Sequence, residues 1–216
     1  MQPITKVKNW LFPSCPWIVL LGLDGSGKSS VIEALDDLLA AAGYEGLFVM
    51  HRRPQVVYRL AAASSAGRIE HYQKPPHSRG RSAVKLAAMW LDWLSGYVLH
   101  IHGRRARGIL VVADRHSLID LLVDPLRYRY GGSPRWVRLV VRLVPMPNAV
   151  ILLDAPTAVL QTRKQELTTE KATELRHNYL NLVQQWPGSY VIDVDRPLDE
   201  VVADVQSILQ ELRMGR

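Results

Sequence analysis

The sequence predicts an α/β fold in which helices cover both faces of one parallel β-sheet. Two observations lead to this fold class: short, nearly continuous aliphatic runs recur along the chain, and amphipathic segments lie between them. Such runs are typical of strands buried on both faces, and strands that alternate with helices pair in parallel. The runs occupy residues 19–21, 47–50, 109–113, 150–153 and 190–194.

Amphipathic segments supply the helices. A glycine-rich loop after the first strand leads into a helix whose apolar positions keep one face, and Gly43 is expected to close it. The last helix has Pro197 near its first position and carries a long apolar stripe. The apolar positions are Val31, Ile32, Leu35, Leu38 and Leu39 in the first helix, and Leu198, Val201, Val202, Val205, Ile208, Leu209 and Leu212 in the last.

A further helix is predicted with Ser133 as its cap and Pro134 at its first position. Arginines are expected on one of its faces and apolar side chains on another. Two interpretations remain open: a solvated arginine face over a core stripe, or a surface that docks to an acidic partner or a membrane. The arginines are Arg135, Arg138 and Arg142, and the apolar residues are Trp136, Leu139, Val140 and Leu143.

The chain of 216 residues suits one globular domain, residues 1–216, in which residues 1–16 form an N-terminal extension. No apolar run is long enough to span a membrane, and the run after Pro16 is too short for a signal peptide. The one cysteine, Cys15, cannot form an internal disulfide and fits a reducing compartment. We therefore expect a cytoplasmic protein.

The net charge of +7 and the pI of about 9.7 indicate polyanionic partners. Nucleotides, phosphorylated sugars, nucleic acid and an acidic membrane face all fit this balance. The sequence holds no nucleic-acid recognition motif, and arginine-rich phosphate pockets explain the charge equally well. We therefore expect a nucleotide or another small phosphorylated molecule as the partner, rather than nucleic acid.

Residues 22–29, GLDGSGKS, match the phosphate-binding pattern G-x-x-x-x-G-K-[ST]. A strand enters this loop and a helix leaves it, so backbone N–H groups can surround an anion at the positive end of the helix. Lys28 would reach the β- and γ-phosphates, and the Ser29 hydroxyl would bind Mg²⁺. The residues expected to bind ATP here are Gly22, Asp24, Gly25, Ser26, Gly27, Lys28, Ser29 and Ser30.

Two further segments fit a site for phosphoryl transfer. The strand ILVVAD ends in Asp114, followed by Arg115, so the carboxylate would point into the crevice where such sheets bind ligands. An acid that caps the next helix is the alternative. After the fourth strand, Arg163 and Lys164 precede the polar segment QELTTEKAT. It would form a short lid over ATP at about residues 163–172 or, alternatively, solvated surface.

Four segments carry a resemblance to a known family: GLDGSGKSS, ADRH, VILLDAP with its downstream Arg-Lys pair, and LRHNYLNL. Over about residues 17–212, the chain resembles the thymidylate kinase family. The resemblance implies a P-loop kinase fold with a five-stranded parallel sheet in the order 2-3-1-4-5, and it allows a homodimer. It implies Mg²⁺ and ATP as phosphoryl donor, with a nucleoside monophosphate as acceptor and dTMP as the best guess. HRRP together with DLLVDP and RYRYGG is similar to a divergent branch linked to bacterial surface polysaccharides.

The resemblance also implies roles for individual residues. Lys28, Asp114 and Arg163 would be catalytic, and Ser29 and Asp114 would hold Mg²⁺. Arg163 and Lys164 would serve ATP from the lid. The residues expected on the acceptor side are Asp24, Arg52, Arg53, Asp92 and Arg115.

The acceptor side departs from the family's pattern at two places. In HRRPQ, Arg53 stands where the family has Glu, and Gln55 stands where it has Gly. In WLDWLSGY, Asp92 matches, but Trp93 replaces an arginine that the family uses to grip the acceptor phosphate. That contact is worth about 1.5–3 kcal/mol. Either another cation, Arg53 or Arg68, compensates for its loss, or the acceptor differs.

An ATP-dependent kinase is the leading hypothesis from the sequence. A sugar or sugar phosphate could replace dTMP as its acceptor. A regulatory module that binds nucleotide without transferring phosphate is a second class. A nucleic-acid-binding protein, suggested by the charge, is a third.

Overall fold

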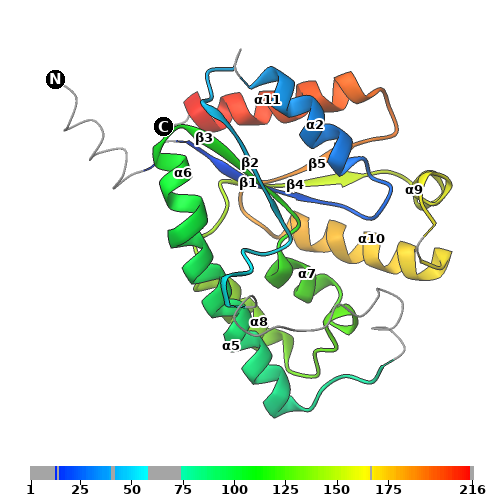
Figure 1. Cartoon of the computed structure of the whole chain (residues 1–216). Coiled ribbons are helices and arrows are strands. Elements are labelled where there is room, and N and C mark those ends of the chain that lie inside the picture. Colours follow the sequence, from blue (N-terminus) through cyan, green and yellow to red (C-terminus); the bar gives the residue numbers. More distant parts are fainter. Residues whose placement is uncertain (1–12, 14, 40–41, 58–73, 166, 215–216) are drawn as a thin grey trace.

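The computed structural model describes residues 13, 15–39, 42–57, 74–165 and 167–214, and a twisted sheet runs through its centre (Figure 1). Its strands are β1 (Trp17–Leu21), β2 (Gly46–His51), β3 (Ile109–Asp114), β4 (Ala149–Asp154) and β5 (Ser189–Asp193). They are parallel and lie in the order β2-β3-β1-β4-β5. The predicted fold class and sheet order are confirmed, with Val194 just beyond the end of its strand.

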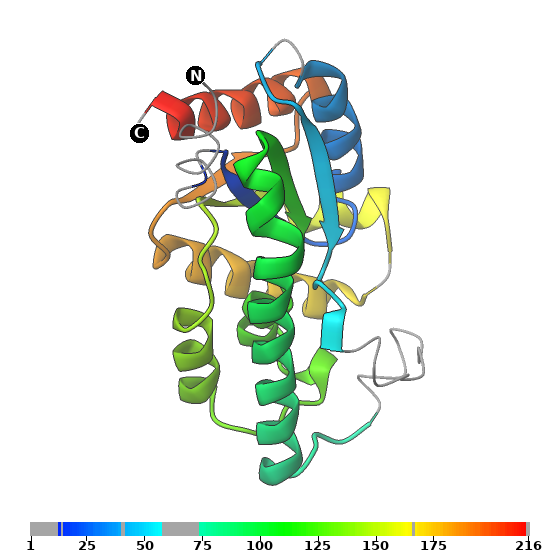
Figure 2. The ribbon, with the colours of Figure 1, turned by 60° about the vertical axis from the view of Figure 1, so that its left-hand side comes forward.

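Helices cover both faces of this sheet. α2 and α11 lie side by side on one face, whereas α7, α10 and the path α5–η1–α6 lie on the other (Figures 1 and 2). The bounds are α2 (Lys28–Leu38), α5 (Arg79–Gly96), the π-helix η1 (Tyr97–His102), α6 (Gly103–Ala106), α7 (Ser117–Val123), the 3₁₀-helix η2 (Leu126–Tyr128), α8 (Pro134–Arg142), α9 (Thr157–Arg163), α10 (Thr169–Gln184) and α11 (Leu198–Met214).

The middle strand, β1, is buried along its whole length. Ile18 pairs with Val112 of β3 on one side and with Ala149 of β4 on the other. The edge strands β2 and β5 are half-exposed over most of their length. The carboxyl ends of β1, β3 and β4 therefore meet near the middle of one sheet edge, which is where sheets of this kind bind ligands.

The helical path α5–η1–α6 runs beside the loop that follows β2. A Cβ atom on Gly96 would lie 2.1 Å from the ring of Pro54, so glycine at this position allows the loop to lie directly against α5. Trp93, three residues earlier on α5, is 1% exposed and belongs to the hydrophobic core. The α5 helix thus fixes the position of residues 52–57, the segment that holds the predicted acceptor-side residues Arg52 and Arg53.

Helix ends follow the local signals in the sequence. The Ser133 hydroxyl accepts a hydrogen bond from the N–H of Arg135 (3.3 Å), and Pro134 is the first residue of α8. Pro197 directly precedes α11, and Gly43 lies in the turn between α2 and β2. The predicted cap of α8 is confirmed.

Of the two interpretations left open for α8, the one that places these apolar side chains in a core stripe is wrong. Trp136, Leu139 and Leu143 are 62%, 45% and 54% exposed. Val137 and Val141, one turn apart, are buried instead. The reason is that α8 lies at the periphery and packs against α7 and α5, which cover a narrower stripe than a sheet would. Its solvent face therefore carries apolar side chains among the exposed arginines.

Part of the predicted organisation lies outside the described residues. This holds for residues 1–12 and 14 of the N-terminal extension, for residues 58–73, which include Arg68, and for Glu166 in the lid segment. Within the described ranges, no helix has the length and apolar character needed to cross a membrane.

Candidate active site

The glycine-rich loop lies at the carboxyl end of β1 and leads into α2, which begins at Lys28. Gly27 is left-handed (φ 78°); among the described residues, no side chain caps α2 and no acid occupies its first turn. The first N–H groups of α2 are therefore open toward an anion, and the helix dipole favours negative charge there. Ser29 and Ser30, in this first turn, are exposed.

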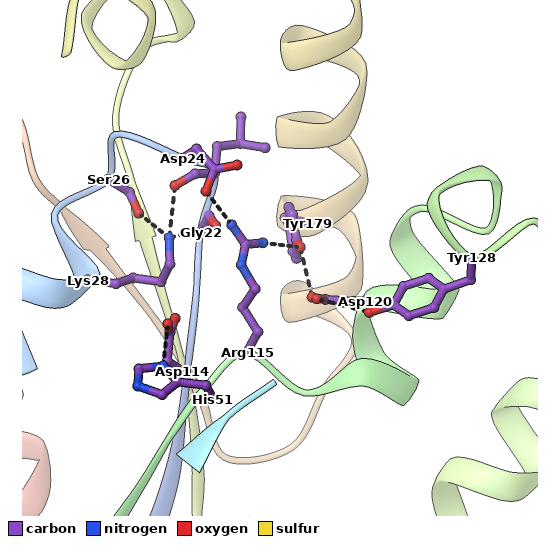
Figure 3. Close-up of polar contacts among 11 residues, drawn as sticks. Gly22, Asp24, Ser26, Lys28, His51, Asp114, Arg115, Asp120, Tyr128 and Tyr179 are labelled. Carbon is purple, nitrogen blue, oxygen red and sulfur yellow. Dashed lines mark hydrogen bonds and ion pairs between the residues drawn. The ribbon is translucent and has the colours of Figure 1, made fainter. Parts of the chain in front are cut away.

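Lys28 reaches back over the loop (Figure 3). Its Nζ donates hydrogen bonds to the carbonyl oxygens of Gly22 (3.0 Å) and Leu23 (2.9 Å) and to the Ser26 hydroxyl (3.1 Å). Burial, and then the positive charge of Arg115, lower the pKa of Lys28 to about 7. Phosphate oxygens at this position would favour the charged form of the amine.

The end of α9 packs directly on the glycine-rich loop. A Cβ atom on Gly25 would lie 2.7 Å from the carbonyl oxygen of Leu160, and close to the Cβ atoms of Lys164 (3.4 Å) and Arg163 (3.5 Å). Glycine at position 25, with φ 90°, permits this approach. The structure thus brings both cations of the predicted lid beside the loop.

The Arg163 guanidinium has its own partners in this structure. Its Nη1 donates to the carbonyl oxygen of Val194 (3.0 Å), and its Nη2 lies 3.9 Å from Asp195 Oδ1. Its side chain is 40% exposed, so these contacts are weak enough to be exchanged for a phosphate.

Asp114 ends β3 with one of its carboxylate oxygens unused. Oδ2 lies 3.3 Å from His51 Nδ1, whereas Oδ1 is shielded from solvent and has no hydrogen-bond partner among the described residues (Figure 3). Magnesium in phosphoryl-transfer sites is commonly held by one or two carboxylates together with substrate phosphates. The donor set of Asp114 and the exposed Ser29 hydroxyl fits Mg²⁺ on this chemistry.

Arg115 joins β3 to the glycine-rich loop. Its backbone has φ 74°, and its N–H donates to the carbonyl oxygen of Leu20 (3.0 Å). The guanidinium Nη2 donates to Asp24 Oδ1 at 3.0 Å, and Nη1 donates to the Tyr179 hydroxyl at 3.3 Å (Figure 3). Two residues expected on the acceptor side, Asp24 and Arg115, are therefore an ion pair.

The polar network continues from Arg115 to α7. The Tyr179 hydroxyl donates to Asp120 Oδ1 (2.9 Å), and the Tyr128 hydroxyl lies 3.5 Å from Asp120 Oδ2. Burial and the Asp120 carboxylate raise the pKa of both tyrosines, so both stay protonated and act as donors. Asp120 itself is 1% exposed.

Arg52 sits between the ends of β3 and the start of α7. Its N–H donates to the Asp114 carbonyl oxygen (2.8 Å), and its own carbonyl accepts from the N–H of Ser117 (3.0 Å). These hydrogen bonds place the Arg52 backbone beside Asp114, the residue before Arg115, at the carboxyl ends of the strands. The structure thus brings Arg52 to the predicted acceptor side.

The Asp92 carboxylate binds backbone N–H groups of the segment that follows β2. Its Oδ2 accepts from the N–H of Gln55 (3.2 Å) and its Oδ1 from the N–H of Val57 (2.8 Å). Gln55 takes φ 61°, a conformation that suits the glycine expected from the family resemblance. The pKa of Lys85 is lowered to about 8 by burial and then by the positive charge of Arg53.

Trp93 has a structural environment. Its indole ring stacks on the His116 ring with 3.6 Å between the centroids, and its Nε1 donates to the Ser117 hydroxyl (3.0 Å). The side chain is buried at the start of α7, next to the Ser117 backbone that binds Arg52. Trp93 therefore takes the place of the expected arginine with an apolar ring that supports α7.

Sequence reasoning missed several residues of this site. Tyr179 contacts Arg115 and His51 contacts Asp114, both predicted site residues, and Asp120 accepts a hydrogen bond from Tyr179. The sequence signal for Asp120 is an acid within the apolar run SLIDLLV, and the signal for Tyr179 is a phenol on the buried stripe of α10. Arg176 was also missed: it forms a two-bond ion pair with Asp154 at the end of β4 (2.8 and 2.7 Å).

The sheet order and the phosphate-binding loop assign the chain to the class of P-loop nucleotide kinases. Curated proteins named probable thymidylate kinase narrow that class. One, from Halorubrum lacusprofundi, is 30% identical over 214 residues, which cover 90% of this chain and 98% of that protein. Another, from Pyrobaculum aerophilum, is 27% identical over 206 residues (91% and 97%), and a third, from Pyrococcus horikoshii, is 24% identical over 211 residues (92% and 98%).

The chain therefore belongs to the thymidylate kinase family and is an ATP-dependent kinase. No protein-family model matches the chain. None of the three relatives bears a name that concerns surface polysaccharides, so the narrower resemblance stays a prediction.

Proposed function

We propose that this protein transfers the γ-phosphoryl group of ATP to a nucleoside monophosphate, and that dTMP is the acceptor. One observation carries the proposal: Arg115 at the end of β3 lies 3.0 Å from Asp24 of the glycine-rich loop. A cation suited to an acceptor phosphate thus adjoins the loop suited to ATP. The names of the relatives, probable thymidylate kinases, favour dTMP.

On the donor side, the open amino end of α2 and the Lys28 amine would bind the β- and γ-phosphates. Lys28 would exchange the carbonyl oxygens of Gly22 and Leu23 for phosphate oxygens. Ser29 and Asp114 would hold Mg²⁺, which would neutralise charge on the transferring group. Arg163, released from the Val194 carbonyl, would approach the same group from the lid, together with Lys164.

On the acceptor side, Arg115 would bind the acceptor phosphate while Asp24 keeps the guanidinium in place. Arg52 would lie beside it, because its backbone is tied to the strand end at Asp114. Asp92 would act as a positioning residue, since both its oxygens bind the backbone of the segment after Arg52. Transfer would then depend on positioning and charge stabilisation rather than on covalent chemistry by the protein.

A panel assay tests this function. The protein is incubated with Mg²⁺ and ATP and with single nucleoside monophosphates, nucleosides, sugars or sugar phosphates, and ADP release is followed. We expect dTMP to stimulate turnover most. We also expect Lys28→Ala to lower kcat/KM at least 100-fold, on the order of the loss of one charge-stabilising group.

The other outcomes separate the alternatives. Strong stimulation by a sugar phosphate and weak stimulation by dTMP would mean that the acceptor is a sugar phosphate and not dTMP. This outcome is tested because the buried Trp93 stands where the family has an arginine. Tight ATP binding without acceptor-stimulated turnover would contradict transfer and favour a regulatory module. Omission of Mg²⁺ should abolish turnover if Ser29 and Asp114 act as proposed.

A further inference from the structure

Arg127 lies in η2, just after α7, and one of its side-chain donors is unused. Its backbone N–H donates to Asp124 Oδ1 (3.2 Å), which fixes the turn. The Nη2 atom of its guanidinium is shielded from solvent and has no hydrogen-bond partner among the residues that the structure describes. A charged donor left buried without a partner costs about 1–3 kcal/mol or more, so such a group is normally matched by a ligand or a water.

Two carboxylates of the neighbouring network already have other partners. Asp24 pairs with Arg115, and the Asp120 oxygens lie against the hydroxyls of Tyr179 and Tyr128. In the described part of the chain, neither Arg52 nor Arg127 makes an ion pair with a carboxylate. Both guanidinium groups are therefore available to an anionic ligand.

Arg127 adjoins the polar network of Arg115 through its neighbour Tyr128, whose hydroxyl lies 3.5 Å from Asp120 Oδ2. Burial, and then the charge of Arg127, lower the pKa of Arg52. The Asp120 carboxylate already acts on this region and raises the pKa of Arg127. A further anion beside the two guanidinium groups would offset the repulsion between them. Because guanidinium groups bind phosphate through two parallel hydrogen bonds, a phosphate group suits such a pair.

The position of this pair matches the missing family arginine. Residue 93, where that arginine is expected, donates from the Trp93 indole to Ser117, and the Ser117 N–H in turn donates to the Arg52 carbonyl. An arginine at position 93 would therefore lie beside Arg52. That charge is absent here. The Arg127 Nη2 atom, which has no partner among the described residues, belongs to η2, where the Tyr128 hydroxyl lies 3.5 Å from Asp120 Oδ2 of the same network.

We propose that Arg127, together with Arg52, binds the phosphate group of the acceptor and replaces the family's arginine at position 93. This inference rests on the proposed function, since it concerns the acceptor half of that site. It differs from the compensation expected from the sequence, which named Arg53 or Arg68. The acceptor is accordingly a phosphorylated molecule, and a neutral sugar or nucleoside lacks the group that this pair would bind.

Steady-state kinetics give the first test. We expect Arg127→Gln to raise the KM for the phosphorylated acceptor about 10- to 100-fold, the range of a lost charge-assisted contact, with the KM for ATP unchanged. Arg127→Lys should fall between, because it keeps the charge and loses the fork. Arg129→Gln is the matched control: Arg129 is in the same loop, and its Nε binds the Pro75 carbonyl (3.0 Å) instead.

A titration with inorganic phosphate, without ATP, tests the pair independently of turnover. The background is Lys28→Ala, which weakens phosphate binding at the glycine-rich loop. We expect phosphate to raise the unfolding temperature of this protein, and the additional change Arg127→Gln to remove most of that rise. Circular dichroism before the titration checks that each variant is folded.

The outcomes are distinguishable. If no acceptor is phosphorylated by the wild type, the proposed function fails, while the phosphate titration still decides the role of Arg127. Equal phosphate stabilisation with and without Arg127, or an Arg127→Gln variant whose acceptor KM matches that of Arg129→Gln, would overturn the inference and leave Arg127 as a structural residue. Should Arg127→Gln fail to fold, Arg127→Lys carries the same comparison.

Discussion

Arg52 and Arg115 occupy left-handed backbone conformations, with φ of 61° and 74°, at neighbouring strand ends. Such a conformation costs a residue with a Cβ atom about 1–3 kcal/mol and persists where the surroundings fix it. Hydrogen bonds to Leu20 and from Ser117 fix it here. Both residues are arginines of the candidate acceptor side, and their left-handed conformations place the two backbones side by side at the carboxyl ends of the strands.

His116, the next residue along, provides a prediction for pH dependence. It is buried at the start of α7, where its Nδ1 accepts from the Ile119 N–H (3.4 Å) and its ring stacks on Trp93. Burial lowers the pKa of His116 from 6.5 to about 3. Between these values the unfolded chain binds a proton that the folded protein excludes, so the free energy of unfolding falls as the pH falls through this window.

The measurement is denaturant unfolding at several pH values for the wild type and for His116→Asn, whose side-chain oxygen can still cap α7. Between pH 7 and pH 5, we expect the wild type to lose about 2 kcal/mol more than the variant. The carboxylates titrate alike in both proteins and cancel in the difference. Parallel pH profiles would show that His116 is already protonated in the folded protein or hydrated there.

At the residue scale, the sequence predicted what a local pattern encodes. Lys28 and Ser29 follow from the glycine-rich motif, and Asp114 follows from its place at a strand end. Asp120 and Tyr179 could not be predicted, because their hydrogen bond joins residues 59 positions apart. The sequence showed only that Trp93 stands where the family has an arginine. The stacking of Trp93 on the His116 ring depends on how α5 packs beside the start of α7, which the sequence alone does not give.

At the element scale, α8 separates local signals from tertiary ones. Ser133 and Pro134 are sufficient to predict where the helix starts, because a cap acts within one turn. The buried face could not be predicted, since arginine and apolar positions alternate and the neighbours of α8 decide between them. The structure buries Val137 and Val141 and exposes Leu139.

Substitutions on α8 check this orientation. We expect Val137→Ala to lower the free energy of unfolding by about 1–3 kcal/mol, because it leaves a cavity against α7. Leu139→Ala should change it by less than about 0.5 kcal/mol. Alanine gains more helix propensity over valine than over leucine, which acts against the expected order, so a larger loss for Val137→Ala in chemical denaturation reports burial. A larger loss for Leu139→Ala than for Val137→Ala would mean that the helix is rotated or that its outer face is covered in solution.

At the scale of the whole molecule, the amino and carboxyl ends of the strands have different hydrogen-bond networks. The candidate site lies at the carboxyl ends of the strands. At the amino ends, Arg105 of α6 donates to the Cys15 carbonyl (2.7 Å), to the Tyr97 hydroxyl (3.0 Å) and to Asn148 Oδ1 (3.1 Å). The Asn148 side chain also accepts from the N–H of Trp17 (3.0 Å). One buried guanidinium therefore ties α6 to the starts of β1 and β4.

This separation predicts that stability and substrate binding can be changed independently. Arg105→Met removes the guanidinium and leaves buried carbonyl and amide oxygens unpaired, so we expect the free energy of unfolding to fall by about 2–4 kcal/mol. The KM values for ATP and for the acceptor should stay within twofold of the wild type at temperatures where the variant is folded, because β1 separates Arg105 from the site by about 17 Å.

Arg107→Met is the matched control, since Arg107 is exposed on the same turn and binds the Gly103 carbonyl (3.1 Å). Thermal unfolding and steady-state kinetics on the same preparations make the comparison. A raised KM for either substrate in Arg105→Met would mean that the strands transmit the loss to the opposite edge, and the two networks would then be one.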